Sequence, residues 1–265
     1  MERAEAVRND ARGGGRHLID DEKMARALTA AYYAKVTMVD HNVGRLLQQI
    51  ESMGLSDDTI IVFTADHGNM LGDHGRWFKG VMYEGSSRIP LMIKAPRRSA
   101  LAEVFNRGKV VPEMVENIDV MPTLMEMIGR PLRANTGFQG TSLVNLAAGK
   151  ETSWKAAIFA ERGSMMVRTT RHKLIKNQEK GTRNGTGEYE LYDLVKDPGE
   201  DVNLIDESAC ASAAADLKAR LEAWQKECPA PPIITGVWTT QDTASAEGQV
   251  KTRRRQLKQG AKTKQ

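Results

Sequence analysis

The pattern of apolar and polar positions predicts a long amphipathic helix near the start of the chain. Asp20 or Asp21 can cap its N-terminus, and apolar residues then recur at helical spacing over residues 22–53. Gly54 can adopt the left-handed conformation that ends many helices. The face expected to be buried consists of Tyr32, Val36, Val39, Val43, Leu46, Leu47 and Ile50.

Apolar runs after this helix predict the strands of an α/β core. Residues 60–63 are Ile-Ile-Val-Phe, with no polar residue between them. Such a run is typical of a strand covered on both faces, as in a parallel sheet between helices. Residues 88–96 predict a second strand. Residues 109–117 predict a third, and Pro112 restricts it to a sheet edge because proline has no N–H to donate.

The second half of the chain has a different pattern. Residues 118–129 predict a short helix, and residues 155–177 then alternate apolar and polar positions with turn signals between them. Residues 188–194 continue that alternation, which indicates an antiparallel sheet. A second amphipathic helix is predicted over residues 208–228. We therefore expect an α/β core followed by a smaller α+β part.

These patterns divide the chain into four parts. The expected parts are a flexible lead-in at residues 1–19, the core at 20–150, a C-terminal α+β subdomain at 151–230, and a loop with a basic tail at 231–265. The composition, 40% apolar and 27% charged, is that of an ordinary globular protein. No apolar run has the length of a membrane span.

The net charge of +4 comes from the tail. Residues 251–265 carry seven basic residues and no acidic one, so the rest of the chain has 31 basic against 34 acidic residues. We expect these residues to form a solvated basic tail, and the alternative is an arm that binds nucleic acid. We expect no nucleic-acid partner. No signal peptide is visible in the sequence, and localisation and oligomeric state stay open.

A cluster of polar groups, which would cost free energy to bury, follows the first predicted strand. Residues 64–80 read Thr-Ala-Asp-His-Gly-Asn-Met-Leu-Gly-Asp-His-Gly-Arg-Trp-Phe-Lys-Gly. In open α/β sheets, ligands bind outside the carboxyl ends of the strands. Asp66 and His67 are of metal-ligand type, and the ammonium of Lys79 suits an anionic ester. By residue type alone, such an Asp-His pair is more often hydrogen-bonded or exposed than bound to a metal.

The order of the motifs resembles the sulfatase family of the alkaline-phosphatase superfamily. Asp-His-Gly is followed by Leu-Gly-Asp-His-Gly, by Lys79 twelve residues after His67, by Tyr-Glu, and by Arg-Ile-Pro-Leu. Residues 117–129 are similar to a helix motif of that family, and residues 190–204, Glu-Leu-Tyr-Asp-Leu-Val-Lys-Asp-Pro-Gly-Glu-Asp-Val-Asn-Leu, to its C-terminal signature. The resemblance extends over about residues 20–205.

This resemblance implies an alkaline-phosphatase-like fold and a divalent-metal site. The expected architecture is a mixed, largely parallel sheet between helices, with a small C-terminal antiparallel sheet and a packed helix. Asp66 and His67 match the pair that completes the metal site, with Ca²⁺ the expected ion and Mn²⁺ or Mg²⁺ the alternatives. Lys79 matches the lysine that contacts the sulfate and its leaving oxygen.

Three further residues of the loop are candidates for contact with the substrate. His74 lies within the motif, either as a catalytic residue in contact with the substrate or as a residue that supports the loop. Trp77 and Arg76 are candidates for the pocket wall, with ordinary loop packing as the alternative. The expected substrate is a sulfate ester, either a small molecule or a sulfated glycan.

The family's nucleophile has no counterpart in this sequence. It is a formylglycine made from Cys or Ser in a C/S-x-P-x-R motif, and neither Cys210 nor Cys228 has that context. The resemblance therefore implies the C-terminal part of a longer sulfatase, inactive by itself. The alternatives are a phosphonate or phosphodiester hydrolase of the same superfamily and a binding module without catalysis.

Overall fold

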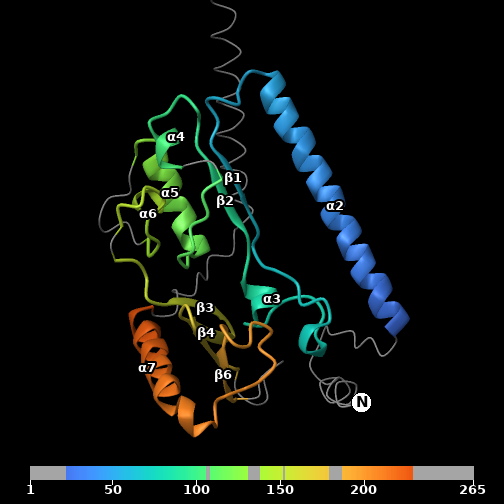
Figure 1. The fold of residues 1–265 in the computed structure, drawn as a ribbon, viewed down its shortest axis with the longest axis vertical. Helices are drawn as coiled ribbons and strands as arrows, with labels where there is room; N and C mark the ends of the chain where they lie inside the picture. The colour runs from blue at the N-terminus through green and yellow to red at the C-terminus, as the bar shows by residue number, and fades with distance from the viewer. Residues whose placement is uncertain (1–21, 106–107, 131–137, 152, 179–186, 229–265) are drawn as a thin grey trace, which may run out of the picture. The chain divides into compact units, whose positions relative to one another are not determined.

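The computed structural model describes residues 22–105, 108–130, 138–151, 153–178 and 187–228. Its longest element is helix α2, Glu22–Ser52, which confirms the first predicted helix (Figure 1). Gly54 ends this helix with φ 69°, the left-handed conformation that its sequence position indicated. The chain divides after Ala223 into two units, and the contacts described below lie within the first.

The apolar face of α2 is not buried. No residue of the helix is buried, and Val36 and Leu46 are 49% and 60% exposed. Towards its N-terminal end, Tyr33 and its neighbours share a shallow depression with Leu71 and Trp77. Apolar periodicity shows which face of a helix is suited to packing, but burial also needs a partner element.

Strands β1, Ile61–Thr64, and β2, Leu91–Lys94, form an antiparallel pair. Two of the three predicted strands of the core are therefore present. The neighbours expected to cover β1 on both faces are not among the described residues: Phe63 and Thr64 are exposed, and the only described partner of β1 is the antiparallel β2. The apolar run favoured a strand, but it did not determine the direction of its neighbour.

The prediction of a third strand is wrong. Residues 109–116 form no strand in the described part of the chain, and residues 117–119 form a 3-10 turn. Pro112 cannot donate to a ladder, which leaves this segment free to follow an irregular path. Val110, Val111 and Val115 instead line an apolar pocket.

One face of the β1–β2 pair packs against short helices. Ile60 and Ile93 contact a core of Ala95, Met127 and Val144. The helices concerned are α4, Leu101–Val104, α5, Val120–Met127, and α6, Val144–Ala147. Helix α5 confirms the predicted short helix at residues 118–129.

The C-terminal part is a four-stranded antiparallel sheet in the order β3-β4-β5-β6, as the sequence pattern predicted (Figure 1). The strands are β3 Ile158–Arg162, β4 Ser164–Arg168, β5 His172–Lys176 and β6 Tyr189–Asp193. Val167, Leu174 and Leu191 are fully buried in it. Helix α7, Ala211–Glu227, follows, with Leu217 and Leu221 buried and Lys218 over the ring of Tyr189.

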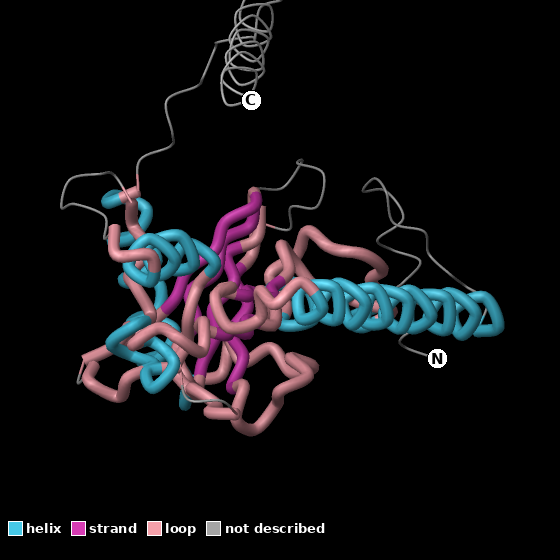
Figure 2. The backbone as a smooth tube through the Cα atoms, turned by 90° about the horizontal axis from the view of Figure 1, so that it is seen from above, coloured by secondary structure: helices cyan, strands magenta, loops and turns pink. Residues whose placement is uncertain are grey.

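A shared core joins the loop after β1 to this sheet. Met70, Met82 and Tyr83 pack with side chains from β4, β5 and β6, namely Met166, Ile175 and Tyr192. Figure 2 shows the strands in magenta, with helices and long loops around them. The loop that carries the candidate residues is therefore packed on the C-terminal sheet. No helix of the described residues is long and apolar enough to cross a membrane.

Candidate active site at the end of strand β1

Asp66 and His67 lie directly beyond the carboxyl end of β1. The Asp66 carboxylate accepts a hydrogen bond from the His67 backbone N–H at 3.0 Å, and its second oxygen lies 3.3 Å from His67 Nε2. Asn117 donates to the Ala65 carbonyl at 3.1 Å and so holds the turn that begins here. The Asp66 side chain is 84% exposed, so its oxygens remain accessible to a ligand.

The ring of His67 is oriented by two different contacts. Nδ1 lies 2.8 Å from the Gly68 carbonyl, which can only accept, so Nδ1 carries the proton. Nε2 lies 2.5 Å from Lys79 Nζ, and an ammonium can only donate. The Nε2 lone pair therefore points toward Lys79. This tautomer is the one that a histidine needs to ligate a metal through Nε2.

The segment between His67 and Lys79 is a strained loop. Leu71, His74 and Phe78 have positive φ angles of 49°, 53° and 74°, which non-glycine residues rarely adopt. Backbone hydrogen bonds from Met70 to Phe78 at 2.7 Å and from Gly72 to Arg76 at 2.8 Å close the loop. Strained backbone of this kind persists where surrounding contacts hold it, and it is common at functional sites.

The Asp-His-Gly turn contacts helix α3, Glu84–Ser87, with no space between the two backbones. Gly68 donates its N–H to the Ser86 carbonyl at 2.8 Å. A Cβ atom on Gly68 would lie 2.2 Å from the Gly85 carbonyl oxygen. Glycine is therefore required at this position, and α3 fixes the turn that carries Asp66 and His67.

The structure brings Asp66, His67 and Lys79 together, and it places His74 elsewhere. His74 Nε2 lies 3.0 Å from the Gly199 carbonyl, and its ring stacks on Tyr83 at a centroid distance of 4.1 Å. These contacts favour a supporting role over contact with the substrate.

Arg76 and Trp77 also have partners within the loop region. The Arg76 guanidinium lies 6.0 Å from the centre of the Tyr83 ring. The indole of Trp77 covers Gly72, and it lines the depression shared with the N-terminal part of α2. Their expected role in a pocket wall stays a prediction.

Charged residues behind the site form a buried cluster that the sequence analysis did not find. Lys173 is fully buried, and its Nζ lies 2.8 Å from both Glu84 Oε1 and Glu200 Oε1. Burial by itself would raise the pKa of Glu84. The positive charges of Lys173 and, to a smaller extent, Arg168 outweigh this effect and lower the pKa below its usual value. The Tyr-Glu and Asp-Pro-Gly-Glu motifs contain two of these residues. They were visible in the sequence, but nothing there indicated that they touch.

Two buried tyrosines next to this charged cluster donate to the same carboxylate. The hydroxyls of Tyr83 and Tyr192 both donate to Glu190 Oε2 at 2.8 Å. Burial, together with the Glu190 charge, raises the pKa of the Tyr83 hydroxyl well above its usual range. Both hydroxyls therefore stay protonated and hold Tyr83 beneath His74.

The donors present fit part of a divalent-cation site. Asp66 offers carboxylate oxygens and His67 offers an unprotonated Nε2, 3.3 Å from one of those oxygens. Calcium takes six to eight oxygen ligands, and manganese and zinc accept imidazole more readily. Among the described residues, no group of three or more acidic, histidine or cysteine side chains is arranged to hold a metal. This pair can therefore complete a site but cannot form one alone.

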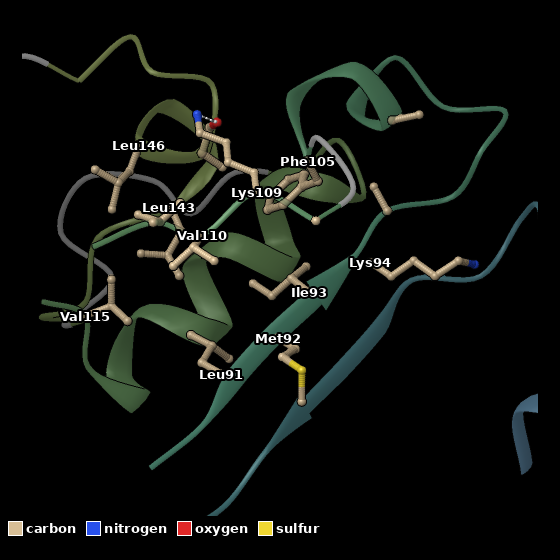
Figure 3. Close-up of a pocket in the computed structure, with 15 residues that line it drawn as sticks. Leu91, Met92, Ile93, Lys94, Phe105, Lys109, Val110, Val115, Leu143 and Leu146 are labelled. Atoms are coloured by element: carbon tan, nitrogen blue, oxygen red, sulfur yellow. Dashed lines mark hydrogen bonds between the residues drawn. The ribbon is translucent and has the colours of Figure 1, made fainter. Parts of the chain in front are cut away.

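An apolar cavity lies away from this chemistry. It has a volume of about 560 Å³ and is lined by β2, by the apolar side chains of Phe105, Val110, Val111 and Val115, and by Leu143 and Leu146 (Figure 3). Its one polar contact in the view is the hydrogen bond from Lys109 Nζ to the Ala147 carbonyl at 2.9 Å (Figure 3). None of the candidate site residues is among its described lining.

Two family models match the chain. The model described as N-sulphoglucosamine sulphohydrolase, C-terminal, matches residues 72–227, and the model described as Sulfatase matches residues 5–130. An arylsulfatase of Clostridium perfringens is 34% identical over 188 residues, which are 71% of this chain and 38% of that relative. The chain thus spans well under half the length of this curated relative.

Solved structures share the fold. A protein in complex with its substrate D-glucosamine-2-N,6-O-disulfate is 30% identical, with a TM-score of 0.60, and the match covers 74% of this chain and 40% of that one. The phosphonate monoester hydrolase of Agrobacterium radiobacter is 26% identical, with a TM-score of 0.69, over 84% of this chain and 49% of that one. These similarities confirm the α/β class and the small C-terminal sheet with its helix.

Proposed function

Because this chain belongs to the sulfatase family of the alkaline-phosphatase superfamily, we propose that it contributes one wall of a site that hydrolyses sulfate esters. The observation that carries this proposal is the convergence of the Asp66 carboxylate and the Lys79 ammonium on His67 Nε2, at the carboxyl end of β1. A carboxylate, an unprotonated imidazole nitrogen and a cationic amine together suit an anionic ester and a divalent cation.

Asp66 and His67 are the residues that would hold the cation. When bound, a divalent cation polarises the non-bridging oxygens of an ester. The hydrogen bond from His67 Nδ1–H to the Gly68 carbonyl keeps the ring in the tautomer and orientation that ligation requires. Calcium is the ion to test first, with manganese and magnesium beside it.

We propose that Lys79 acts on the departing oxygen. Its ammonium reaches His67 Nε2, so it lies beside the pair that would hold the cation. A fixed positive charge at this point offsets the negative charge that develops on the leaving oxygen when the ester bond breaks. The same lone pair of His67 cannot serve both Lys79 and a cation, so cation binding requires Lys79 to release Nε2.

The nucleophile of this reaction lies outside the sequence described here. The chain contains no C/S-x-P-x-R motif, the context in which related sulfatases generate formylglycine. We therefore expect no turnover by these 265 residues alone. Catalysis requires a polypeptide that carries both the Asp66, His67 and Lys79 wall and such a nucleophile.

A sulfated amino sugar is the substrate class to test first. The longer family match is named for N-sulphoglucosamine, and one solved structure that resembles this fold holds D-glucosamine-2-N,6-O-disulfate. Hydrolysis of phosphonate monoesters is the second candidate, because the phosphonate monoester hydrolase structure covers 84% of this chain at a TM-score of 0.69. The 6-O-sulfate of such a sugar and a phosphonate monoester are both anionic esters, whereas an N-sulfo group is an anionic sulfamate.

Cation binding by a polypeptide that carries this pair together with the remaining ligands tests the ligand assignment directly. We expect Asp66→Ala to weaken binding of Ca²⁺ or Mn²⁺ at least tenfold in calorimetric titration, because it removes one carboxylate donor of the site. Asp73→Ala is the matched control, since Asp73 is an exposed acid of the same loop. Equal affinities for Asp66→Ala and the unmodified chain would show that Asp66 is not a ligand.

The reaction class needs a separate assay. In a polypeptide that includes the nucleophile, we expect faster hydrolysis of aryl sulfates and glucosamine sulfates than of aryl phosphonate monoesters. The reverse preference would favour the second candidate. Absence of both activities, with cation binding retained, would support a binding module instead.

A further inference from the structure

We propose that the turn Asp197–Asp201 of the C-terminal part positions Lys79, and that His74 and Glu200 are the positioning residues through which it does so. The inference rests on the proposed function only for the role of Lys79 itself. The turn lies more than 110 residues from Lys79 in the sequence, and it contacts the polypeptide on both sides of that lysine.

The first contact is made before Lys79, through His74. His74 Nε2 lies 3.0 Å from the Gly199 carbonyl oxygen, and since a carbonyl only accepts, the ring nitrogen is the donor. The other attachment of this ring is Tyr83, on which it lies nearly parallel, at 5°. His74 has a φ of 53°, so its backbone is held in a conformation that it would not adopt freely.

The second contact is made after Lys79, through Glu200. Its carboxylate accepts the backbone N–H of Glu84, the first residue of α3, at 2.6 Å and the Lys173 ammonium at 2.8 Å. Glu200 is 2% exposed and has a φ of 59°. A buried carboxylate on a strained backbone needs partners, and both of its partners belong to the support of the site.

The two contacts lie symmetrically around the lysine. His74 precedes Lys79 by five residues, and Glu84 follows it by five. The loop that contains His74 and precedes Lys79 is closed by hydrogen bonds from Met70 to Phe78 and from Gly72 to Arg76. Ordering backbone residues costs conformational entropy, so an unheld loop would spread Lys79 over many positions. Holding both sides keeps its backbone in one place before a ligand binds.

A merely structural turn is the alternative, and it makes a different prediction. If the turn only stabilised the C-terminal sheet, loss of the His74 contact would lower the free energy of global unfolding. Amide exchange in the loop and in the sheet would then speed up together. If the turn holds the loop, the same loss opens the loop locally while the sheet stays closed.

Two substitutions of His74 separate its hydrogen bond from its stacking. His74→Phe keeps a flat ring for Tyr83 but has no N–H for Gly199. His74→Gln keeps an N–H but has no ring. His41→Phe is the matched control, because His41 is exposed on α2, away from this contact.

Amide hydrogen exchange on the 265-residue chain is the test. We expect His74→Phe to speed exchange at Met70 and Gly72 about tenfold, whereas exchange at Leu174 and Leu191 in the sheet stays unchanged. His74→Gln should stay within about threefold of the unmodified chain, and His41→Phe should match it. The tenfold change corresponds to the loss of one hydrogen bond worth about 1.4 kcal/mol.

Two results would overturn the inference. One is exchange at Met70 and Gly72 that His74→Phe does not change. The other is equal acceleration of the loop and the sheet, which would indicate a general loss of stability. Because exchange is read without a cation or an ester, failure of the proposed hydrolysis does not affect this test. In a catalytically complete polypeptide, His74→Phe should lower kcat about tenfold with KM within twofold, and His74→Gln should restore it.

Discussion

His67 connects the candidate residues, because Asp66 and Lys79 both lie against its Nε2. Nδ1 faces a backbone carbonyl, and the closest partner of Nε2 is the Lys79 ammonium, so these two contacts favour the tautomer with the proton on Nδ1. This arrangement distinguishes the pair from an ordinary exposed Asp-His pair. It leaves the Asp66 carboxylate accessible at the end of a strand, next to a cationic side chain that contacts His67 Nε2.

Replacement of Lys79 separates its proposed role in turnover from its contact with His67. In a catalytically complete polypeptide, we expect Lys79→Met to lower kcat by about 10²–10³, because a charge that stabilises the transition state is lost. Cation affinity should be unchanged or higher, since the substitution frees His67 Nε2. Lys150→Met, at an exposed lysine, is the control. A loss of cation affinity as large as the loss of kcat would contradict this assignment, and steady-state kinetics with calorimetry measures both.

Helix α3 is the element that fixes the site turn, although it has only four residues. Gly68 donates to the Ser86 carbonyl of this helix, and the Glu200 carboxylate accepts the N–H of Glu84 at its start. Lys173 and Arg168 in the C-terminal sheet pair with Glu84 at its start. The short helix therefore joins the end of β1 to the second sheet.

The close contact at Gly68 gives a sharp test of this junction. Gly68→Ala should destabilise the chain by about 1–3 kcal/mol, because its Cβ would lie 2.2 Å from a backbone oxygen that cannot move without displacing α3. Gly44→Ala is the matched control, since nothing lies within 4 Å of a Cβ at that helical position. It should stabilise the chain by up to about 1 kcal/mol. Urea unfolding measures both, and equal effects would refute the contact.

The Glu84–Lys173 pair makes the stability of the fold depend on pH in the acidic range. The pKa of Glu84 is below its usual 4.5 in the folded chain, so the fold is stabilised above pH 4.5 and loses that stabilisation as the pH falls through the folded value. Glu84→Gln should be about 2 kcal/mol less stable at pH 7. The difference in Tm from the unmodified chain should narrow below pH 4.5. A difference that stays constant from pH 7 to pH 3 would show that this carboxylate does not titrate with folding.

The chain as a whole exposes a large apolar surface. The exposed residues include Leu28, Tyr33, Val36, Val39, Leu46 and Leu47 of α2, and Phe63 and Met92 of the β1–β2 pair. Apolar surface of this extent is uncommon on a monomeric protein and is usually covered by another surface. Phe63 and Met92 are cross-strand neighbours, so they form one continuous patch.

We therefore expect the 265-residue chain to associate at micromolar concentration. Light scattering after size-exclusion chromatography should show species larger than the 29.3 kDa monomer, with binding of an apolar dye. Leu46→Lys should reduce association, because it places a charge within the apolar face. Gln48→Lys adds the same charge at a polar position and should have a smaller effect. A monodisperse monomer that melts cooperatively would contradict this expectation.

The sequence by itself determined what depends on neighbours along the chain. Helical spacing gave α2 and its end at Gly54, alternation gave the antiparallel sheet, and motif order gave the position of Asp66, His67 and Lys79. Each of these features follows from local backbone preferences or fixed spacing, so a linear pattern contains it.

Only the tertiary structure decided which distant groups meet. It showed that β1 pairs antiparallel with β2, that the apolar face of α2 stays exposed, and that residues 109–116 form no strand. It also placed His74 on Gly199 and buried Lys173 between two glutamates. The physical reason is that burial, strand partners and ion pairs depend on which surfaces come together in space, and a one-dimensional pattern does not contain that information.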